Sequence, residues 1–186
     1  MIEEIKEIAR LQLQYSSENT PEMERRGVLI RTELPNALKG HWSEYTDSIA
    51  KYSKDLSMEG SDGIGRKTQA PWLRIYSKEL SPSATTGFYL VIHFSTNGKY
   101  FFITLGCGAS KWDSEKGDLV KYSDDEIKSK VDWALGSLQK ADLDISHFKD
   151  KINIGSAHSL PKSFEKATIL CKTYEVATAS DNEISN

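Results

Sequence analysis

The chain has 186 residues, of which 38% are hydrophobic and 27% charged, and its formal net charge is -3. Length and composition suit one globular domain with a substantial core, and they exclude a largely disordered chain. The slight acidic excess excludes a general electrostatic attraction to nucleic acid. No apolar run approaches the roughly 20 residues that span a bilayer, and the acidic, helical start is unlike a secretory signal, so we expect a cytoplasmic protein without a membrane partner.

Two helices are predicted near the N-terminus. Apolar residues recur at helical spacing over Ile2–Leu11, with Glu and Lys between them, which predicts an amphipathic helix that ends near Tyr15. A second helix is expected to begin near Pro21, because proline suits a first helical turn, and to end before Pro35. The pattern over residues 51–59 is compatible with a strand or with an extended connection.

The middle of the chain predicts strands. Trp72–Tyr76 alternates between the two faces of a strand, and Phe88–Phe94 is a near-continuous apolar run, which is typical of a strand buried on both faces. Thr96–Gly98 then closes a hairpin with a strand over Tyr100–Leu105, because Asn-Gly supplies the positive φ that tight hairpin turns require.

Beyond the hairpin the pattern again favours helices. Ser123–Glu126 has the sequence of a capping box, and the apolar spacing after it predicts a helix that continues to about Lys140. A further strand is predicted over Ile145–Ile154, and a last helix or strand over Phe164–Tyr174. After Val176 the chain becomes small and polar, as in a tail or the start of a linker.

These elements predict an α+β fold. We expect a central, mostly antiparallel sheet with a hairpin, packed by N-terminal and C-terminal helices. Residues 1–176 are predicted to form a single domain, and residues 177–186 a polar tail.

The loop after residue 59 matches two nucleotide-binding motifs only in part. Gly60–Thr68 is similar to a P-loop, but that motif requires lysine directly after its second glycine, and Arg66 occupies this position. Polar residues precede the loop where a buried strand should lead into it, and the third glycine of the dinucleotide fingerprint is absent. The glycines allow a close approach either to a neighbouring strand or to a sugar-phosphate backbone, and the sequence leaves both open.

The sequence contains no recognisable catalytic or metal-binding pattern. The four histidines have no metal-ligand spacing, and no Gly-x-Ser-x-Gly elbow is present. Cys107 and Cys171 are far apart and lack a partner spacing, which argues against a structural disulfide or a zinc site. We therefore expect no catalytic residue, no metal and no cofactor.

Positive charge and aromatic rings are concentrated in the segment from Gly60 to Trp112. Six cations there face two acids: Arg66, Lys67, Arg74, Lys78, Lys99 and Lys111 against Asp62 and Glu79. Most of the aromatic residues in the segment are expected in the core. A ring left at the surface between cations could stack on a base while the cations contact phosphate.

Three strings in this segment carry a family resemblance. They are Gly63-Ile64-Gly65, then Ala70-Pro71-Trp72-Leu73, and then the run from Ser81 through Gly87-Phe88-Tyr89 to Phe94. In order and spacing the chain resembles the N-terminal DNA-binding domain of McrB-type, modification-dependent (methylcytosine-specific) restriction enzymes. The resemblance implies a non-catalytic domain that flips a modified base of duplex DNA into an aromatic pocket. It also implies a restriction and defence complex whose GTPase or ATPase motor and nuclease lie on other domains or subunits.

The same resemblance implies the residues of the base pocket. Trp72 matches the ring that stacks on the flipped base, and Tyr89 matches a tyrosine that lines the pocket. Ile64 stands where the family has an aromatic residue, and His93 stands where it can have an aliphatic one. His93 lies on the same strand face as Tyr89 and could hydrogen-bond a base edge. Modified cytosine is expected, while a larger cytosine substituent, N-modified adenine or no flipped base remain open.

Contacts to the DNA backbone are expected from the loop and the strand that follows it. The candidates are Gly63, Gly65, Arg66, Lys67, Arg74 and Lys78, with Ile64 at the loop tip. An alternative function is a protein-interaction or regulatory module that uses this surface without binding DNA. A small-molecule enzyme that uses His93 and an acidic residue is a third and the least favoured class.

Overall fold

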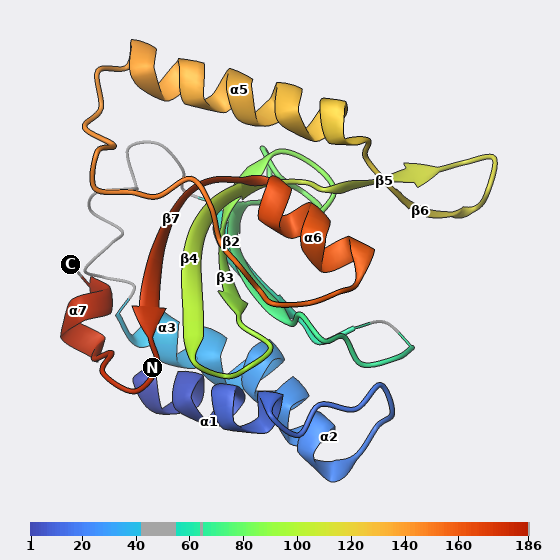
Figure 1. Cartoon of the computed structure of the whole chain (residues 1–186), viewed down its shortest axis with the longest axis vertical. Coiled ribbons are helices and arrows are strands. Elements are labelled where there is room, and N and C mark those ends of the chain that lie inside the picture. Colours follow the sequence, from blue (N-terminus) through green and yellow to red (C-terminus); the bar gives the residue numbers. More distant parts are fainter. Residues whose placement is uncertain (42–54, 64, 186) are drawn as a thin grey trace.

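A five-stranded antiparallel sheet forms the centre of the structure (Figure 1). The computed structural model describes residues 1–41, 55–63 and 65–185. The sheet has the order β1-β2-β3-β4-β7, with β1 at Leu56–Ser61, β2 at Trp72–Ser77, β3 at Phe88–Phe94, β4 at Tyr100–Cys107 and β7 at Thr168–Glu175. With helices from both ends of the chain packed on this sheet, the predicted α+β fold is confirmed. Within the described residues, no helix is long and apolar enough to cross a membrane.

The N-terminal helices cover one face of the sheet (Figure 1). They are α1 (Ile2–Gln12), α2 (Pro21–Val28), the π-helical turn η1 (Leu29–Glu33) and α3 (Leu34–Gly40). The Thr20 side chain caps α2 by accepting a hydrogen bond from the Met23 amide, at 3.3 Å, and Pro21 occupies the first turn as predicted.

The prediction that the second helix ends before Pro35 is wrong. The π-helical turn precedes this proline, and within that turn the Leu34 amide donates to the Leu29 carbonyl, five residues back. Pro35 therefore occupies the first turn of a new helix, α3, where its missing N–H is tolerated. The helical layer continues to Gly40.

The main hydrophobic core lies between these helices and the sheet. Alternation along the strands directs one set of side chains toward the helices: Leu73, Ile92, Phe94, Phe101 and Tyr174, which pack on Ile5, Ile8, Leu29, Ile30 and Leu34. The rings of Phe101 and Tyr174 stack with centroids 4.9 Å apart. Strand β1 comes so close to η1 that a Cβ on Gly60 would lie 2.1 Å from the Ile30 carbonyl oxygen.

The predicted hairpin between β3 and β4 is confirmed. Gly98 in its turn has φ +65°, and a Cβ there would lie 2.4 Å from the Ala9 carbonyl oxygen of α1. The turn thus needs glycine both for its backbone conformation and for its packing. β3 is buried on both faces only from Val91 onward, since Leu90 is exposed.

The predicted helix after the capping box is confirmed as α5 (Asp124–Lys140), with both capping-box hydrogen bonds present. The sequence analysis missed the short hairpin before it, which consists of β5 (Ser110–Asp113) and β6 (Asp118–Lys121). The segment predicted as a last helix or strand contains the end of α6 (Ser159–Lys166) and then β7.

The strand predicted over Ile145–Ile154 is wrong. This segment runs beside β7, but only Lys149 pairs with it, through one bridge to Cys171. The backbone of Ile154 is engaged elsewhere, because its amide donates to Glu165 of α6 and its carbonyl accepts from the Thr96 amide. Backbone groups with partners outside a ladder cannot extend one.

Residues 177–185 lie against the N-terminal helices. We expected a polar tail there, but Ala179 is part of the main core, and Asp181–Ser185 forms the short helix α7. The Ile2 amide donates to Asp181 Oδ1 at 2.8 Å, which joins the two ends of the described chain (Figure 1). The assignment of residues 1–176 to a single domain stays a prediction.

The contact between β1 and η1 predicts opposite effects for two glycine substitutions. Gly60→Ala should destabilise the fold by about 1–3 kcal/mol, because the added methyl group meets backbone that cannot move aside freely. Gly136→Ala should stabilise it by about 0.5–1 kcal/mol, because Gly136 is inside α5 with open space around it. Urea unfolding of both variants measures the difference, and similar effects at the two sites would contradict the proposed packing.

Candidate functional site

A cavity of about 720 Å³ lies on the sheet face that is turned away from the N-terminal helices. Its floor consists of strand residues that share this face: Trp72 of β2, Tyr89, Val91 and His93 of β3, and Thr104 and Gly106 of β4. Helix α6 lies over the sheet here and contributes Leu160 and Phe164 (Figure 1). A cavity of this size is in the range that takes up a small organic ligand.

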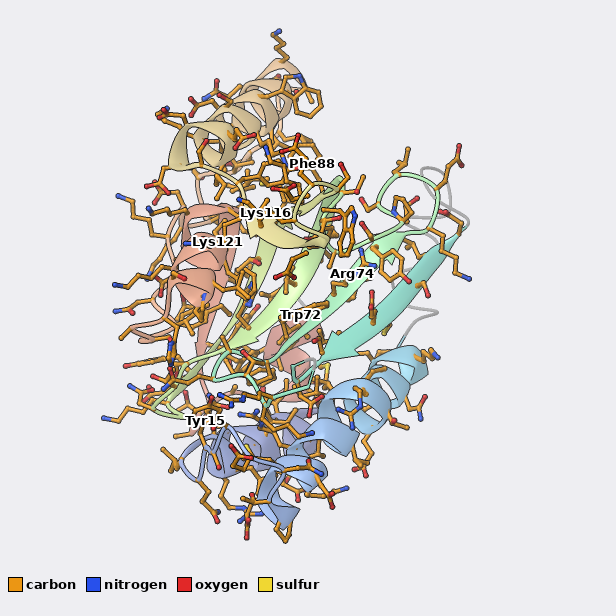
Figure 2. The ribbon with its side chains drawn as sticks, turned by 90° about the vertical axis from the view of Figure 1, so that its right-hand side faces the viewer. Tyr15, Trp72, Arg74, Phe88, Lys116 and Lys121 are labelled. Carbon is orange, nitrogen blue, oxygen red and sulfur yellow. The ribbon has the colours of Figure 1, made fainter. Side chains whose placement is uncertain are left out.

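Trp72 and His93 lie side by side in the cavity floor. They are register partners of the antiparallel pair β2–β3, so their side chains point to the same side of the sheet. Trp72 remains partly exposed, whereas the imidazole of His93 is stacked on Phe164, with ring centroids 5.7 Å apart. In Figure 2 Trp72 lies near the centre of its side of the molecule, with Lys116 and Lys121 above it and Tyr15 below. The cavity thus combines one accessible indole with three further rings, those of Tyr89, His93 and Phe164.

Burial keeps His93 uncharged. Its side chain is 5% exposed, and desolvation lowers its pKa from 6.5 to about 3. Among the described residues, none hydrogen-bonds its buried Nδ1. Since buried polar atoms are normally hydrogen-bonded, this nitrogen is an unusual feature of the cavity wall.

The glycine loop, which is the segment between β1 and β2 that contains Gly63 and Gly65, forms one wall of the cavity. Gly63 has φ +112°, and a Cβ there would lie 2.1 Å from the Arg66 carbonyl oxygen, so only glycine fits this turn. Gly65 has φ +75° but open space around it, and it is not among the cavity-lining residues. Arg66 is exposed and borders the cavity. Ile64, predicted for the pocket and the loop tip, lies outside the described residues.

Hydrogen bonds to the N-terminal helices fix the loop in place. The fully buried Arg26 donates from Nη2 to the Thr68 carbonyl and from Nη1 to Gln12 Oε1, both at 2.7 Å. Three further hydrogen bonds join the same segments: Gln12 Nε2 to Gln69 O, Tyr15 OH to Lys67 O, and Lys67 N to Ser17 O. The wall of the cavity is therefore a continuation of the helical layer.

A buried carboxylate holds the loop from within. Asp62 is 2% exposed, and it accepts hydrogen bonds from Lys67 Nζ at 2.7 Å and from Arg31. Burial opposes its ionisation, but these two hydrogen bonds outweigh that effect and hold the Asp62 pKa below its ordinary value. The ammonium group of Lys67 is thus already paired before any ligand arrives.

Arg74 does not have the position that the sequence analysis gave it. It is 2% exposed, its Nε and Nη2 donate to Glu59 Oε2 at 2.8 and 2.6 Å, and its Nη1 donates to the Ser81 carbonyl. The guanidinium lies 5.4 Å from the ring centroid of Tyr89 and supports that ring from below the surface. A guanidinium that is buried and already paired with Glu59 is not available to a phosphate, so we remove Arg74 from the backbone contacts.

Tyr89 lines the cavity, as the resemblance implied for a pocket residue. Its hydroxyl donates to the Ala84 carbonyl, and burial raises its pKa, so the phenol stays neutral. This end of the cavity is otherwise formed by small residues: Thr85, Gly106, Cys107, Ala109 and Ser110. Small side chains leave the space that the larger rings enclose.

The remaining predicted residues separate into two groups. Trp72, Tyr89, His93, Gly63, Arg66 and Lys67 all line the cavity. Lys78 is exposed just beyond the opposite end of β2 and does not line it. The sequence analysis missed Asp62, Thr104 and Phe164, because no local motif marks a residue that reaches a cavity through tertiary folding.

The local excess of positive charge is smaller in the structure than in the sequence. Three of the six cations are in ion pairs: Lys67 with Asp62, Arg74 with Glu59, and Lys111 with Glu126. Glu59 and Glu126 lie outside the segment that was counted. Arg66, Lys78 and Lys99 form no ion pair with the part of the chain that the structure describes.

The fold and the cavity define a class: an α+β domain that holds a ligand-sized cavity between an antiparallel sheet and helix α6, bordered by the glycine loop. Comparison with protein-family models matches residues 10–185 to the family described as MrcB-like, N-terminal domain. Because the match covers nearly the whole chain, the chain belongs to this family, which confirms the resemblance found in its sequence. Comparisons with curated proteins and with solved structures give no significant match.

The lowered pKa of His93 predicts acid destabilisation. In the unfolded protein the imidazole of His93 binds a proton near pH 6.5, whereas in the folded protein it does so only near pH 3. The stability that is present above pH 6.5 is therefore lost as the pH falls toward 3. His93→Phe keeps an aromatic ring against Phe164 but has no titrating group. The wild-type unfolding free energy, taken relative to this variant, should fall with a slope of up to about 1.4 kcal/mol per pH unit in that window. Parallel pH profiles for the two proteins would contradict the buried, neutral state.

Proposed function

We propose that this domain recognises a modified base in duplex DNA, most of all a modified cytosine, by taking the flipped base into the cavity. It would direct a restriction complex to such DNA, with a GTPase or ATPase motor and a nuclease on other domains or subunits. Membership in the MrcB-like N-terminal domain family supports this function. The observation that carries the proposal is Trp72, a partly exposed indole in the floor of a cavity large enough for a base.

The energetics of base flipping are compatible with this cavity. Extruding a base costs a few kcal/mol of lost stacking and pairing, and stacking it on one aromatic ring returns about 1–3 kcal/mol. The neutral imidazole of His93, next to Trp72 in the floor, can hydrogen-bond an edge of the base without the cost of desolvating a charge. Contacts to phosphate have to supply the rest.

The glycine loop is the part of the cavity wall best suited to phosphate contacts. Arg66 is exposed and free of ion pairs with the described residues, and Gly63 and Gly65 allow the backbone to come close to a ligand. Lys67 can add positive potential, although Asp62 holds its ammonium. Lys78 stays a candidate for a phosphate farther along the duplex.

Trp72→Ala tests the base pocket. We expect it to remove the preference for modified DNA, with a loss of about 5- to 150-fold in affinity for the modified duplex, and to leave weak, salt-sensitive binding. The measurement is fluorescence anisotropy with duplexes that carry unmodified cytosine, methylated cytosine, hydroxymethylated cytosine or methylated adenine. Trp133→Ala is the matched control, because Trp133 is on α5 and does not line the cavity. An unchanged preference in Trp72→Ala would contradict the pocket, and binding to none of the duplexes would favour a protein-interaction module.

Arg66→Ala tests the phosphate contact. It should weaken binding to modified and unmodified duplexes alike. It should also reduce the magnitude of the negative slope of log K against log salt concentration by about one. Lys140→Ala is the control, since Lys140 is an exposed cation at the C-terminal end of α5, which is remote from the glycine loop (Figure 1). The same slope in Arg66→Ala and in the wild type would show that DNA does not pass along the glycine loop.

A further inference from the structure

The β5–β6 hairpin extends outward from the end of the sheet (Figure 1). It is a separate two-stranded sheet, and among the described strands β5 and β6 pair only with each other. An isolated pair of strands has little stability of its own in water. It is held at its base by the hydrogen bond from the Tyr122 amide to the Ala109 carbonyl, at 3.1 Å, and at the side by the ion pair of Lys111 with Glu126, at 2.7 Å.

The two faces of this hairpin have different surroundings. Side chains alternate along a strand, so Ser110 and Trp112 share one face of β5, and Lys121, the register partner of Ser110, shares it too. Ser110 lines the cavity, which places this face on the cavity side. Lys111 is on the opposite face, where it pairs with Glu126 at the start of α5.

The face on the cavity side combines an exposed ring with a cation. The side chain of Trp112 is 64% exposed, and it is among the most exposed large hydrophobic residues that the structure describes. Lys121 is exposed and forms no ion pair with described residues. The acidic pair Asp113 and Asp118 belongs to the other face by register. An indole diagonal to a cation that has no ion pair with the described residues, with the acids of the hairpin strands on the opposite face, is complementary to a base stack and its phosphates.

We propose that the β5–β6 hairpin is a second DNA contact, in which Trp112 stacks on a base next to the position that the flipped base has left and Lys121 contacts the neighbouring phosphate. This inference rests on the function proposed above. Removing one base from a duplex exposes the faces of its neighbours, and an aromatic side chain that covers such a face recovers part of the lost stacking. The hairpin therefore lowers the free-energy cost of base flipping, while the cavity holds the flipped base.

Trp112→Ala, Trp112→Phe and Trp133→Ala form the test set. Trp133 is the matched control, because it is also a tryptophan with 64% exposure, on α5. The probes are a duplex carrying one modified cytosine, chosen as the one that the wild type binds most tightly, and the same duplex without the modification. We expect Trp112→Ala to lose about tenfold in affinity for the modified duplex and less than about twofold for the unmodified one, in which no base is flipped and no neighbouring base face is exposed. Trp112→Phe should retain most of the duplex affinity.

A fluorescent base gives a second readout. 2-Aminopurine next to the modified cytosine should be dimmer in the wild-type complex than in the Trp112→Ala complex, because stacking on indole quenches it. If Trp112→Ala and Trp133→Ala behave alike in both measurements while Trp72→Ala loses the preference for modified DNA, the hairpin contact is overturned and the base pocket stands. If the wild type binds none of the duplexes, both proposals fail together.

Discussion

The buried guanidinium of Arg26 joins the N-terminal helices to the loop that borders the cavity, and the geometry of the candidate site depends on it. Burial lowers its pKa to about 10, which still leaves it charged at neutral pH. Burying a charge is costly unless it is hydrogen-bonded, and each hydrogen bond to a charged group contributes about 1.5–3 kcal/mol. Its acceptors are Gln12 and the Thr68 carbonyl, so its charge fixes the loop relative to α1. Because residues 67–69 are held in this way before a ligand binds, they lose little conformational entropy on binding, and Arg66 directly precedes them.

Elements encoded within a few residues were predictable from the sequence. The hairpin turn at Asn97-Gly98 and the capping box of Ser123 and Glu126 each depend on local backbone chemistry, and the structure contains both. Pro35 shows where local rules fail. Proline ends a regular α-helix, but a π-helical turn before it lets the chain continue, and this turn is matched to the close approach of β1. The sequence of the helix alone carries no information about that neighbour.

Residues whose partners are brought together by tertiary folding could not be placed in this way. Arg74 counted as a surface cation because its partner Glu59 precedes it by 15 residues, and only the β1–β2 register sets the two opposite each other. Phe164 reaches the cavity because α6 folds back over the sheet. Trp72 and His93 were linked through family resemblance, and the β2–β3 register supplies the physical reason, since it makes them neighbours on one face. Charge counts along a sequence therefore overstate a patch when the acids that neutralise it come from adjacent strands.

The ionisable groups around the cavity are in states that suit binding better than chemical reaction. Burial raises the pKa of the Cys107 thiol, which keeps it protonated and weakly nucleophilic, and burial makes the imidazole of His93 a very weak base. The hydroxyl of Tyr89 is engaged with a backbone carbonyl, and the carboxylate of Asp62 is paired with cations. A ligand that enters thus meets ring faces, fixed dipoles and small side chains, with Arg66 at the border. In such a cavity the affinity depends on the shape of the ligand and on its hydrogen-bonding groups, because a polar group that finds no partner there costs more than a missing methyl group. This asymmetry favours the discrimination of a substituent that adds or removes a hydrogen-bonding group over that of a substituent that adds only a methyl group.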